Sequence, residues 1–167
     1  MPRPTETLPQ IAVVPPEGPA QLALVRELFA EYGASLGAAI DPQAFAAEID
    51  ALPGEYGEPR GGLLLALVDG DAAGCCAIRP LDTVDYSNAA EMKRLYVRKA
   101  FRGFGLGRQL AEAALDLARR GGYACVLLDT LDEMESARAL YAELGFEDIP
   151  PYQHHPAAGA HHLKVDI

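Results

Sequence analysis

Residues 102–107 read RGFGLG, and this run of alternating glycines limits what the chain around it can be. The preceding segment AEMKRLYV, residues 90–97, has the pattern of a strand, and an amphipathic helix is expected from about residue 105 to 120. A strand, a glycine-rich loop and a helix in this order direct backbone N–H groups and the positive end of the helix dipole at one point. The segment therefore predicts a binding site for a phosphate-bearing ligand.

Five residues make this loop suitable for binding an anion. Three glycines, Gly103, Gly105 and Gly107, let the backbone turn and approach a ligand where a Cβ atom would obstruct it. Arg102 and Arg108 add positive charge on either side. Each hydrogen bond from a backbone N–H to a charged oxygen contributes about 1.5–3 kcal/mol. Several of them therefore hold a diphosphate with few charged side chains.

The sequence separates three ways of binding phosphate on such a loop. A P-loop requires a Gly-Lys-Ser or Gly-Lys-Thr triplet, which the chain lacks. A dinucleotide fingerprint requires glycine at the position of Arg108, and its strand is normally buried on both faces, whereas EMKRLYV is half polar. Asp129 lies at about the right distance for the ribose-binding acid, so a nicotinamide-dependent enzyme stays open as a disfavoured alternative.

Hydropathy periodicity predicts the other elements and the fold class. Further strands are expected at 10–14, 63–68, 75–81, 123–130, 146–149 and 160–167, and further helices at about 19–36, 42–52 and 134–144. Asp41 followed by Pro42 is typical of a helix start, residues 69–74 (DGDAAG) of a hairpin connection, and the breaker-rich residues 53–62 of a loop. The order predicts an α/β fold of the α+β type, with a mixed, mostly antiparallel central sheet flanked by about four helices.

Length, charge and cysteine usage narrow the class of protein. The 167 residues are half apolar, which predicts one domain over residues 1–167 with a flexible tail over residues 1–9. A net charge of −10 without a basic face argues against nucleic-acid binding. No apolar stretch reaches the ~20 residues of a membrane span, so we expect a cytoplasmic protein. Cys75, Cys76 and Cys125 lie in apolar runs and are expected to be buried rather than to form disulfides.

Two segments together resemble the GNAT superfamily of N-acetyltransferases. RGFGLG fits the pattern [RQ]-x-x-G-x-[GA], and residues 91–122 as a whole resemble the family's acetyl-CoA-binding strand, loop and helix. Downstream, SARALYAELGFEDI, residues 136–149, is similar to the family's A-x-x-L-Y-x-x-x-G-F helix and strand. The resemblance covers residues 63–167 well and the first 60 residues only by the order of elements.

The resemblance implies acetyl-CoA as co-substrate and no metal. The diphosphate of coenzyme A would lie on the glycine loop, and the pantetheine arm would run along the preceding strand. The asparagine that many members carry seven residues before the tyrosine is replaced by Met134, so Ser136 or Thr130 is expected to take its place. The cofactor-binding residues assigned in this way are Leu95, Tyr96, Val97, Arg102, Gly103, Phe104, Gly105, Leu106, Gly107, Arg108, Thr130 and Ser136.

An amine acceptor sets the catalytic requirements. With a pKa of ~10.4, as for lysine, almost all of the amine is protonated at pH 7, so a base or a deprotonating water chain is useful. Glu91 is the expected base, directly or through water; the alternative is a solvated ion pair with Lys93 or Arg94. Tyr141 is by resemblance the acid that protonates the departing thiolate; the alternative is a half-buried aromatic that packs its helix on the sheet.

The acceptor is expected to be a small metabolite or an amino-acid-like amine. Lys93 and Arg94 would bind its carboxylate, and Tyr32 and His154 are further candidate contacts. The paired histidines near the C-terminus are not expected to bind a metal, because neighbouring strand residues point to opposite faces. The sequence thus predicts an N-acetyltransferase that works by direct attack without a covalent enzyme intermediate, with no nucleic-acid or membrane partner, and compatible with a homodimer. A coenzyme A-binding or sensing module without turnover is the main alternative.

Overall fold

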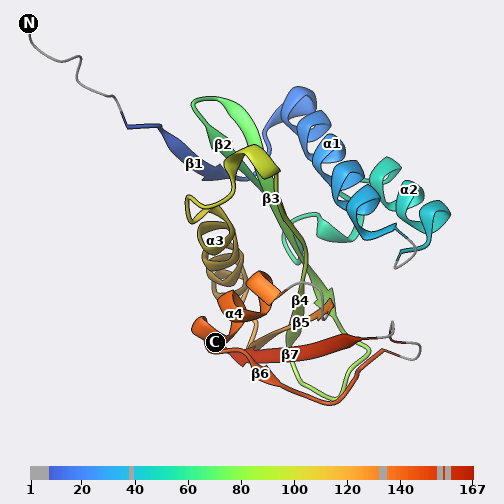
Figure 1. The fold of residues 1–167 in the computed structure, drawn as a ribbon. Helices are drawn as coiled ribbons and strands as arrows, with labels where there is room; N and C mark the ends of the chain where they lie inside the picture. Colours follow the sequence, from blue (N-terminus) through green and yellow to red (C-terminus); the bar gives the residue numbers. More distant parts are fainter. Residues whose placement is uncertain (1–7, 38–39, 132–134, 154–155, 157–158) are drawn as a thin grey trace, which may run out of the picture.

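A seven-stranded sheet forms the centre of the molecule (Figure 1). The computed structural model describes residues 8–37, 40–131, 135–153, 156 and 159–167. In sheet order, the strands are β1 (Ile11–Val14), β2 (Gly62–Val68), β3 (Asp71–Leu81), β4 (Ala89–Val97), β5 (Cys125–Leu131), β7 (Ala160–Asp166) and β6 (Glu147–Asp148). Neighbouring strands of this described sheet are antiparallel, except that β4 and β5 are parallel. The predicted fold class is confirmed.

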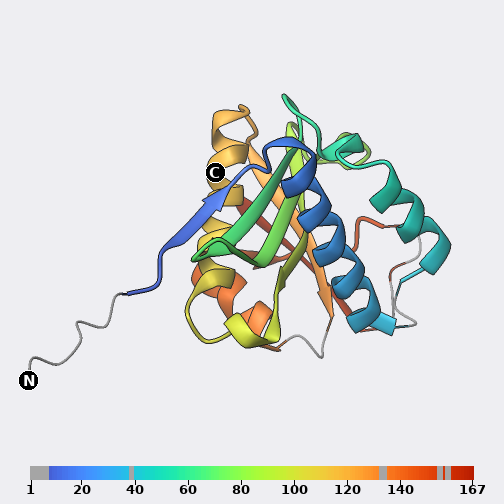
Figure 2. The ribbon, with the colours of Figure 1, turned by 90° about the horizontal axis from the view of Figure 1, so that it is seen from above.

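Helices cover both faces of the sheet (Figure 2). They are α1 (Gly18–Leu36), α2 (Pro42–Asp50), α3 (Leu106–Arg120) and α4 (Glu135–Glu143), with short 3₁₀ turns η2 (Gly54–Tyr56) and η3 (Lys99–Phe101). One face of the sheet packs against α3 and α4, with Leu110 and Tyr141 in that core. The other face packs against α1 and α2, with Phe29 and Phe45 in a second core. No described helix has the length and apolar character needed to cross a membrane.

Local sequence signals account for several element boundaries. The side chain of Asp41 accepts hydrogen bonds from the N–H groups of Gln43 and Ala44 at 3.0 and 3.4 Å, so it caps α2 as predicted. Asp69 and Gly70 both have positive φ, which is the conformation of a two-residue hairpin turn between twisted strands. The connection is therefore shorter than the predicted residues 69–74, because β3 already begins at Asp71.

The burial of side chains tests two further expectations from the sequence, on residues 53–62 and on the cysteines. Residues 53–62, expected to be loop, contain the turn η2, which places the Tyr56 ring edge-on against Phe29 in the second core. The three cysteines, Cys75, Cys76 and Cys125, are free and buried, as predicted.

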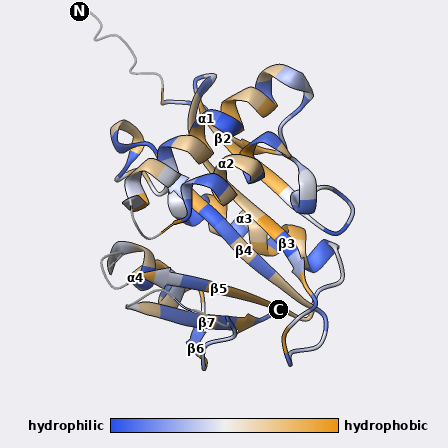
Figure 3. Ribbon diagram, turned by 90° about the vertical axis from the view of Figure 1, so that its right-hand side faces the viewer, coloured by the Kyte–Doolittle hydropathy of each residue, from blue (hydrophilic) through white to orange (hydrophobic). Residues whose placement is uncertain are grey.

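The sheet opens between β4 and β5. These strands are paired only from Ala89 with Cys125 to Glu91 with Leu127, so the rest of β4 extends without β5 beside it. Hydrophilic residues follow this open part of β4 (Figure 3). A β-bulge lies in the same stretch: Arg94 has a φ of 62°, and the β3–β4 register shifts beside it. The opening and the bulge together position the candidate site.

Candidate active site

A groove with a volume of about 850 Å³ runs along the open edge of β4. It is bounded by the end of α1, the glycine loop, the start of α3 and one face of α4. We call it the β4 groove; its lining residues are Tyr32, Ser35, Leu95, Tyr96, Val97, Phe101, Arg102, Gly103, Gly105, Leu106, Gly107, Arg108, Ser136, Ala137 and Leu140. Ten of the twelve residues predicted to bind the cofactor are thus brought together, and Phe104 and Thr130 are not among them.

The glycine loop presents its backbone to this groove. Gly103 and Gly105 have φ angles of 89° and 77°, a region that favours glycine, and Gly105 is the N-cap of α3. The N–H groups of residues 106–108 have no acceptor within the helix, because their i−4 carbonyls lie outside it. Gly107 differs, since a Cβ atom there would make ordinary contact, 3.8 Å from Leu140 Cδ2. The loop therefore offers unpaired donors and a helix N-terminus to an anion.

The side chains around the loop are arranged differently from the expectation. The Nε atom of Arg102 donates to the carbonyl oxygen of Val97 at 2.8 Å. Arg108 forms ion pairs with Glu112 at 3.0 Å and Glu143 at 2.9 Å. Both arginines line the groove, but only the charge of Arg108 is paired with carboxylates, whereas Arg102 is held by a neutral carbonyl group. The Phe104 side chain is 68% exposed and does not line the groove, so the prediction that it binds the cofactor has no support in this geometry.

A smaller pocket of about 130 Å³ lies where β4 and β5 separate. We call it the β4–β5 pocket; it is lined by Tyr32, Leu36, Ile40, Met92, Lys93, Arg94, Leu95, Asp129, Thr130, Leu131, Ala137 and Tyr141. It shares Tyr32, Leu95 and Ala137 with the β4 groove, so the two spaces adjoin. A ligand extended along the groove would thus have one end at this pocket.

Tyr141 reaches the pocket from α4. Its side chain is buried, with the ring edge-on to Phe146 at a centroid distance of 5.5 Å. Burial raises the pKa of the phenol far above its usual value. The hydroxyl is therefore protonated at any working pH, as a proton donor must be before it acts.

The two cationic side chains of the pocket, Arg94 and Lys93, differ in their interactions with carboxylates. Arg94 donates from Nε and Nη2 to the carboxylate of Glu48, both at 2.9 Å, and its guanidinium carbon lies 4.8 Å from the ring centre of Phe45. Lys93 has a longer contact, 3.8 Å from Nζ to Glu91 Oε1. Because the bulge turns Arg94 toward α2, its charge is largely committed there, and Lys93 is the more available cation.

Glu91 does not lie where the sequence led us to expect. Its side chain is 1% exposed, and it lines neither the groove nor the pocket. Oε1 accepts from Arg79 Nε and Oε2 from the Tyr152 hydroxyl, each at 2.7 Å. The ion-pair alternative is closer to the structure, but the main partner is Arg79 and the site is buried rather than solvated. Tyr152, in the described part of the segment between β6 and β7, thus packs its hydroxyl against Glu91.

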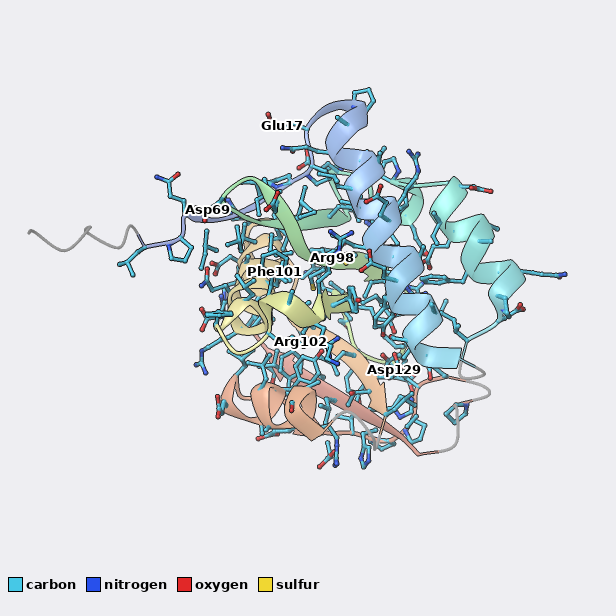
Figure 4. The ribbon with its side chains drawn as sticks, turned by 45° about the horizontal axis from the view of Figure 1, so that its top comes forward. Glu17, Asp69, Arg98, Phe101, Arg102 and Asp129 are labelled. Atoms are coloured by element: carbon cyan, nitrogen blue, oxygen red, sulfur yellow. The ribbon has the colours of Figure 1, made fainter. Side chains whose placement is uncertain are left out.

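Asp129 is the carboxylate that lines the pocket instead. Sequence reasoning noted it only for its spacing from the glycine loop. The signal that identifies it is a charged residue that follows the continuous apolar run CVLL near the end of β5. Figure 4 shows Asp129 near the C-terminal end of α1, apart from Arg98 and Phe101.

The remaining predicted residues are distributed as follows. Tyr32 lines both cavities, Ser136 lines the groove, and the buried Thr130 lines the pocket. His154 lies outside the described residues. Within the described part of the chain, no group of three or more His, Cys, Asp or Glu side chains is arranged to hold a metal ion.

Comparisons with known proteins agree with this geometry. A family model described as the acetyltransferase (GNAT) family matches residues 23–146. An uncharacterized N-acetyltransferase of Schizosaccharomyces pombe is 36% identical over 114 residues, 68% of each chain. An uncharacterized N-acetyltransferase of Escherichia coli K12 is 34% identical over 136 residues, 80% of this chain and 78% of that protein. Human N-acetylaspartate synthetase is 30% identical over 105 residues, 62% of this chain and 34% of that protein.

Solved structures share the fold at low sequence identity. An acetyltransferase from Streptococcus agalactiae gives a TM-score of 0.76 at 21% identity, covering 94% of this chain and 98% of that one. An N-acetyltransferase from Thermoplasma acidophilum in complex with coenzyme A gives 0.70 at 14% identity, covering 95% and 99%. Together with the family model and the curated relatives, these likenesses show that the chain is an N-acetyltransferase and belongs to the GNAT family.

Proposed function

We propose that this protein transfers the acetyl group of acetyl-CoA to the amine of a small, amino-acid-like acceptor by direct attack. One observation carries the proposal: the β4 groove, with its glycine loop, adjoins the β4–β5 pocket, where Tyr141 and Asp129 lie. Coenzyme A in the groove would place its diphosphate on the N–H groups of residues 106–108 and its thioester at the pocket. The T. acidophilum structure of the same fold was solved in complex with coenzyme A, which supports coenzyme A as the ligand class.

Tyr141 supplies the proton for the leaving group in this proposal. When the C–S bond breaks, the departing thiolate, with a conjugate acid of pKa about 8.5, takes the phenol proton. The buried phenol is a weaker acid than a free tyrosine, which keeps the proton in place until negative charge forms on sulfur. The phenol therefore acts during C–S cleavage and not before it.

Direct attack is favoured over a covalent enzyme intermediate by the state of the cysteines. Cys75 and Cys76 are fully buried and Cys125 nearly so. Burial raises the pKa of all three thiols, that of Cys76 to about 12. A nucleophilic cysteine requires the opposite, a lowered pKa and an accessible sulfur.

The acceptor class follows from the charges of the pocket. Lys93 on β4 and Asp129 on β5 lie on opposite sides of the opening, which suits the carboxylate and ammonium groups of a zwitterion. The similarity to N-acetylaspartate synthetase, whose name describes an acetylated amino acid, supports an acceptor of this kind. A lysine-rich protein tail would meet the like charge of Lys93.

Release of free thiol from acetyl-CoA tests the proposal. Amino acids, polyamines, aminoglycosides and lysine-rich peptides are compared side by side at equal concentration. We expect the highest kcat/KM for a carboxylate-bearing amine. A clear preference for polyamines or basic peptides would contradict the acceptor class. Tight coenzyme A binding without thiol release for any amine would instead favour a binding or sensing module.

A further inference from the structure

The β4–β5 pocket contains a carboxylate to which no chemical step has been assigned so far. Asp129 is the single Asp or Glu among the described residues that line the pocket. Its side chain is exposed, and it takes part in no hydrogen bond or ion pair within the described part of the chain. The other carboxylate near the opening, Glu91, is buried and already accepts from Arg79 and Tyr152. Asp129 is therefore the carboxylate that a ligand in the pocket can reach.

The electrostatic surroundings place Asp129 beside the proposed reaction centre. Its negative charge adds to the effect of burial in raising the pKa of both Tyr32 and Tyr141, so the carboxylate stands near both phenols. Tyr32 lies where the groove and the pocket meet, and Tyr141 is the proposed acid. A positively charged amine entering the pocket would thus meet, next to the position of the thioester, the carboxylate of Asp129, which is unpaired among the described residues.

We propose that Asp129 binds the ammonium group of the acceptor and accepts the proton that this group must lose before attack. The inference rests on the proposed function and assigns the base that the sequence placed at Glu91. It also gives the two charges of a zwitterionic acceptor separate partners, since the carboxylate can contact Lys93 on the opposite strand. Asp129 is in this sense both a specificity-determining and a catalytic residue.

In the proposed reaction, one proton passes through Asp129 and another through Tyr141. The ammonium group gives one proton to Asp129, which passes it to solvent, and the neutral nitrogen attacks the thioester carbon to form the C–N bond. Collapse of the tetrahedral intermediate breaks the C–S bond, and the thiolate takes the proton of Tyr141. The nitrogen, now bearing one proton too many, returns one to the Tyr141 phenolate. The products are the amide, free coenzyme A and one proton in solution.

The test uses Asp129→Asn, an isosteric change at an exposed side chain. With the amino acid that the wild-type protein acetylates fastest, we expect kcat/KM at pH 7 to fall about 10²–10⁴-fold, with an unchanged KM for acetyl-CoA. The loss should shrink as the pH approaches the pKa of the amine. It should be small for hydroxylamine, a much weaker base that is mostly neutral at pH 7. A purely structural role would lower both activities at every pH.

Glu91→Gln is the matched control, because it removes a nearby carboxylate that does not line the pocket. It should lower stability while leaving the dependence on amine basicity as in the wild type. An Asp129→Asn protein that keeps full activity, or that loses it equally with the amino acid and hydroxylamine, would overturn the assignment.

If the wild-type protein acetylates no amine, the proposed function is wrong independently of Asp129. In that case, calorimetric titration of the same amino acids into the coenzyme A complex tests whether Asp129 binds the ammonium group. Equal affinities for the wild type and Asp129→Asn would overturn the Asp129 proposal.

Discussion

Glu91 and Arg79 form an ion pair inside the protein: Oε1 of Glu91 lies 2.7 Å from both Nε and Nη2 of Arg79. Arg79 also contacts Glu55 next to α2, and Glu91 accepts a hydrogen bond from Tyr152 in the segment between β6 and β7. The pair thus connects both segments to the centre of the sheet. The pair therefore holds these segments against the sheet beside the β4–β5 pairing.

Replacing Arg79 with methionine should destabilise the protein strongly. The change leaves the buried carboxylate of Glu91 without its main partner, and loss of one member of a buried pair costs about 3–5 kcal/mol. Urea denaturation measures the difference. Arg60→Met is the control, since Arg60 makes a two-bond contact with Asp82 on the exposed surface and should matter little. Equal effects of the two substitutions would contradict the buried-pair interpretation.

Gly105→Val should weaken coenzyme A binding strongly while the protein stays folded. Valine at a φ of 77° is strained, so the start of α3 must shift and its N–H groups lose their alignment. Calorimetric titration with coenzyme A measures the effect. Gly122→Val is the matched control, because Gly122 also has a positive φ, 81°, but lines neither the groove nor the pocket, so it should leave coenzyme A affinity unchanged. Unchanged affinity in a folded Gly105→Val protein would exclude this loop as the diphosphate site.

Tyr141→Phe should lower kcat without large effects on folding. The ring keeps its contact with Phe146, and only the hydroxyl is lost. The expected loss lies toward the lower end of the range for general acids, about 10²–10⁴-fold, because a thiolate leaves without much assistance. Steady-state kinetics at saturating acetyl-CoA provide the measurement. Full activity would mean that water supplies the proton.

Lys93→Ala should raise KM for a carboxylate-bearing acceptor and leave KM for acetyl-CoA nearly unchanged. Lys93 lines the β4–β5 pocket but not the β4 groove, so only acceptor binding loses a charge partner. Lys164→Ala, on β7 beside Asp166, removes the same charge away from the pocket and controls for net charge. Should both variants shift the acceptor KM equally, a specific contact with Lys93 is refuted.

The ion pair between Glu48 and Arg94 should make stability depend on pH in the acidic range. Burial raises the pKa of Glu48, but the hydrogen bonds and charge of Arg94 outweigh this effect and hold it below the usual value. A lowered folded-state pKa contributes stability above the unfolded value of about 4.3, and this stability is lost as the pH falls through the folded-state pKa. Denaturation of Glu48→Gln from pH 6 to pH 3 should show a weaker pH dependence than the wild type.

Features that depend on a few neighbouring residues were predictable from the sequence. Asp41 caps α2 because its side chain reaches N–H groups two and three residues later. The glycine loop is predictable because its positive φ angles restrict the residue type at those positions. The element order followed from periodicity, and it sufficed for the fold class.

The identity of the pocket carboxylate was not predictable in the same way. Glu91 and Asp129 are both carboxylates that follow buried apolar residues on their strands, and each fits a catalytic role by type. Which of them faces the pocket depends on where the parallel β4–β5 pairing ends, at Glu91 with Leu127. The bulge at Arg94 is likewise set by the register with β3 rather than by the local sequence. These features arise from contacts between distant segments.

The short pairing of β4 with β5 also has a mechanical consequence. Three residue pairs and one adjoining hydrogen bond, from the Ala124 N–H to the Asn88 carbonyl, join β4 to β5 in the described sheet, a shorter pairing than that of β4 with β3 or of β5 with β7. A ligand bound along the opening between β4 and β5 would contact both halves of the sheet and add contacts that the protein itself does not make there. A molecule that binds only the folded state stabilises it more as its concentration rises above its Kd, so coenzyme A would reinforce the sheet whenever it is bound. The enzyme would then be most rigid while it holds its substrate, and most easily opened once the product has left.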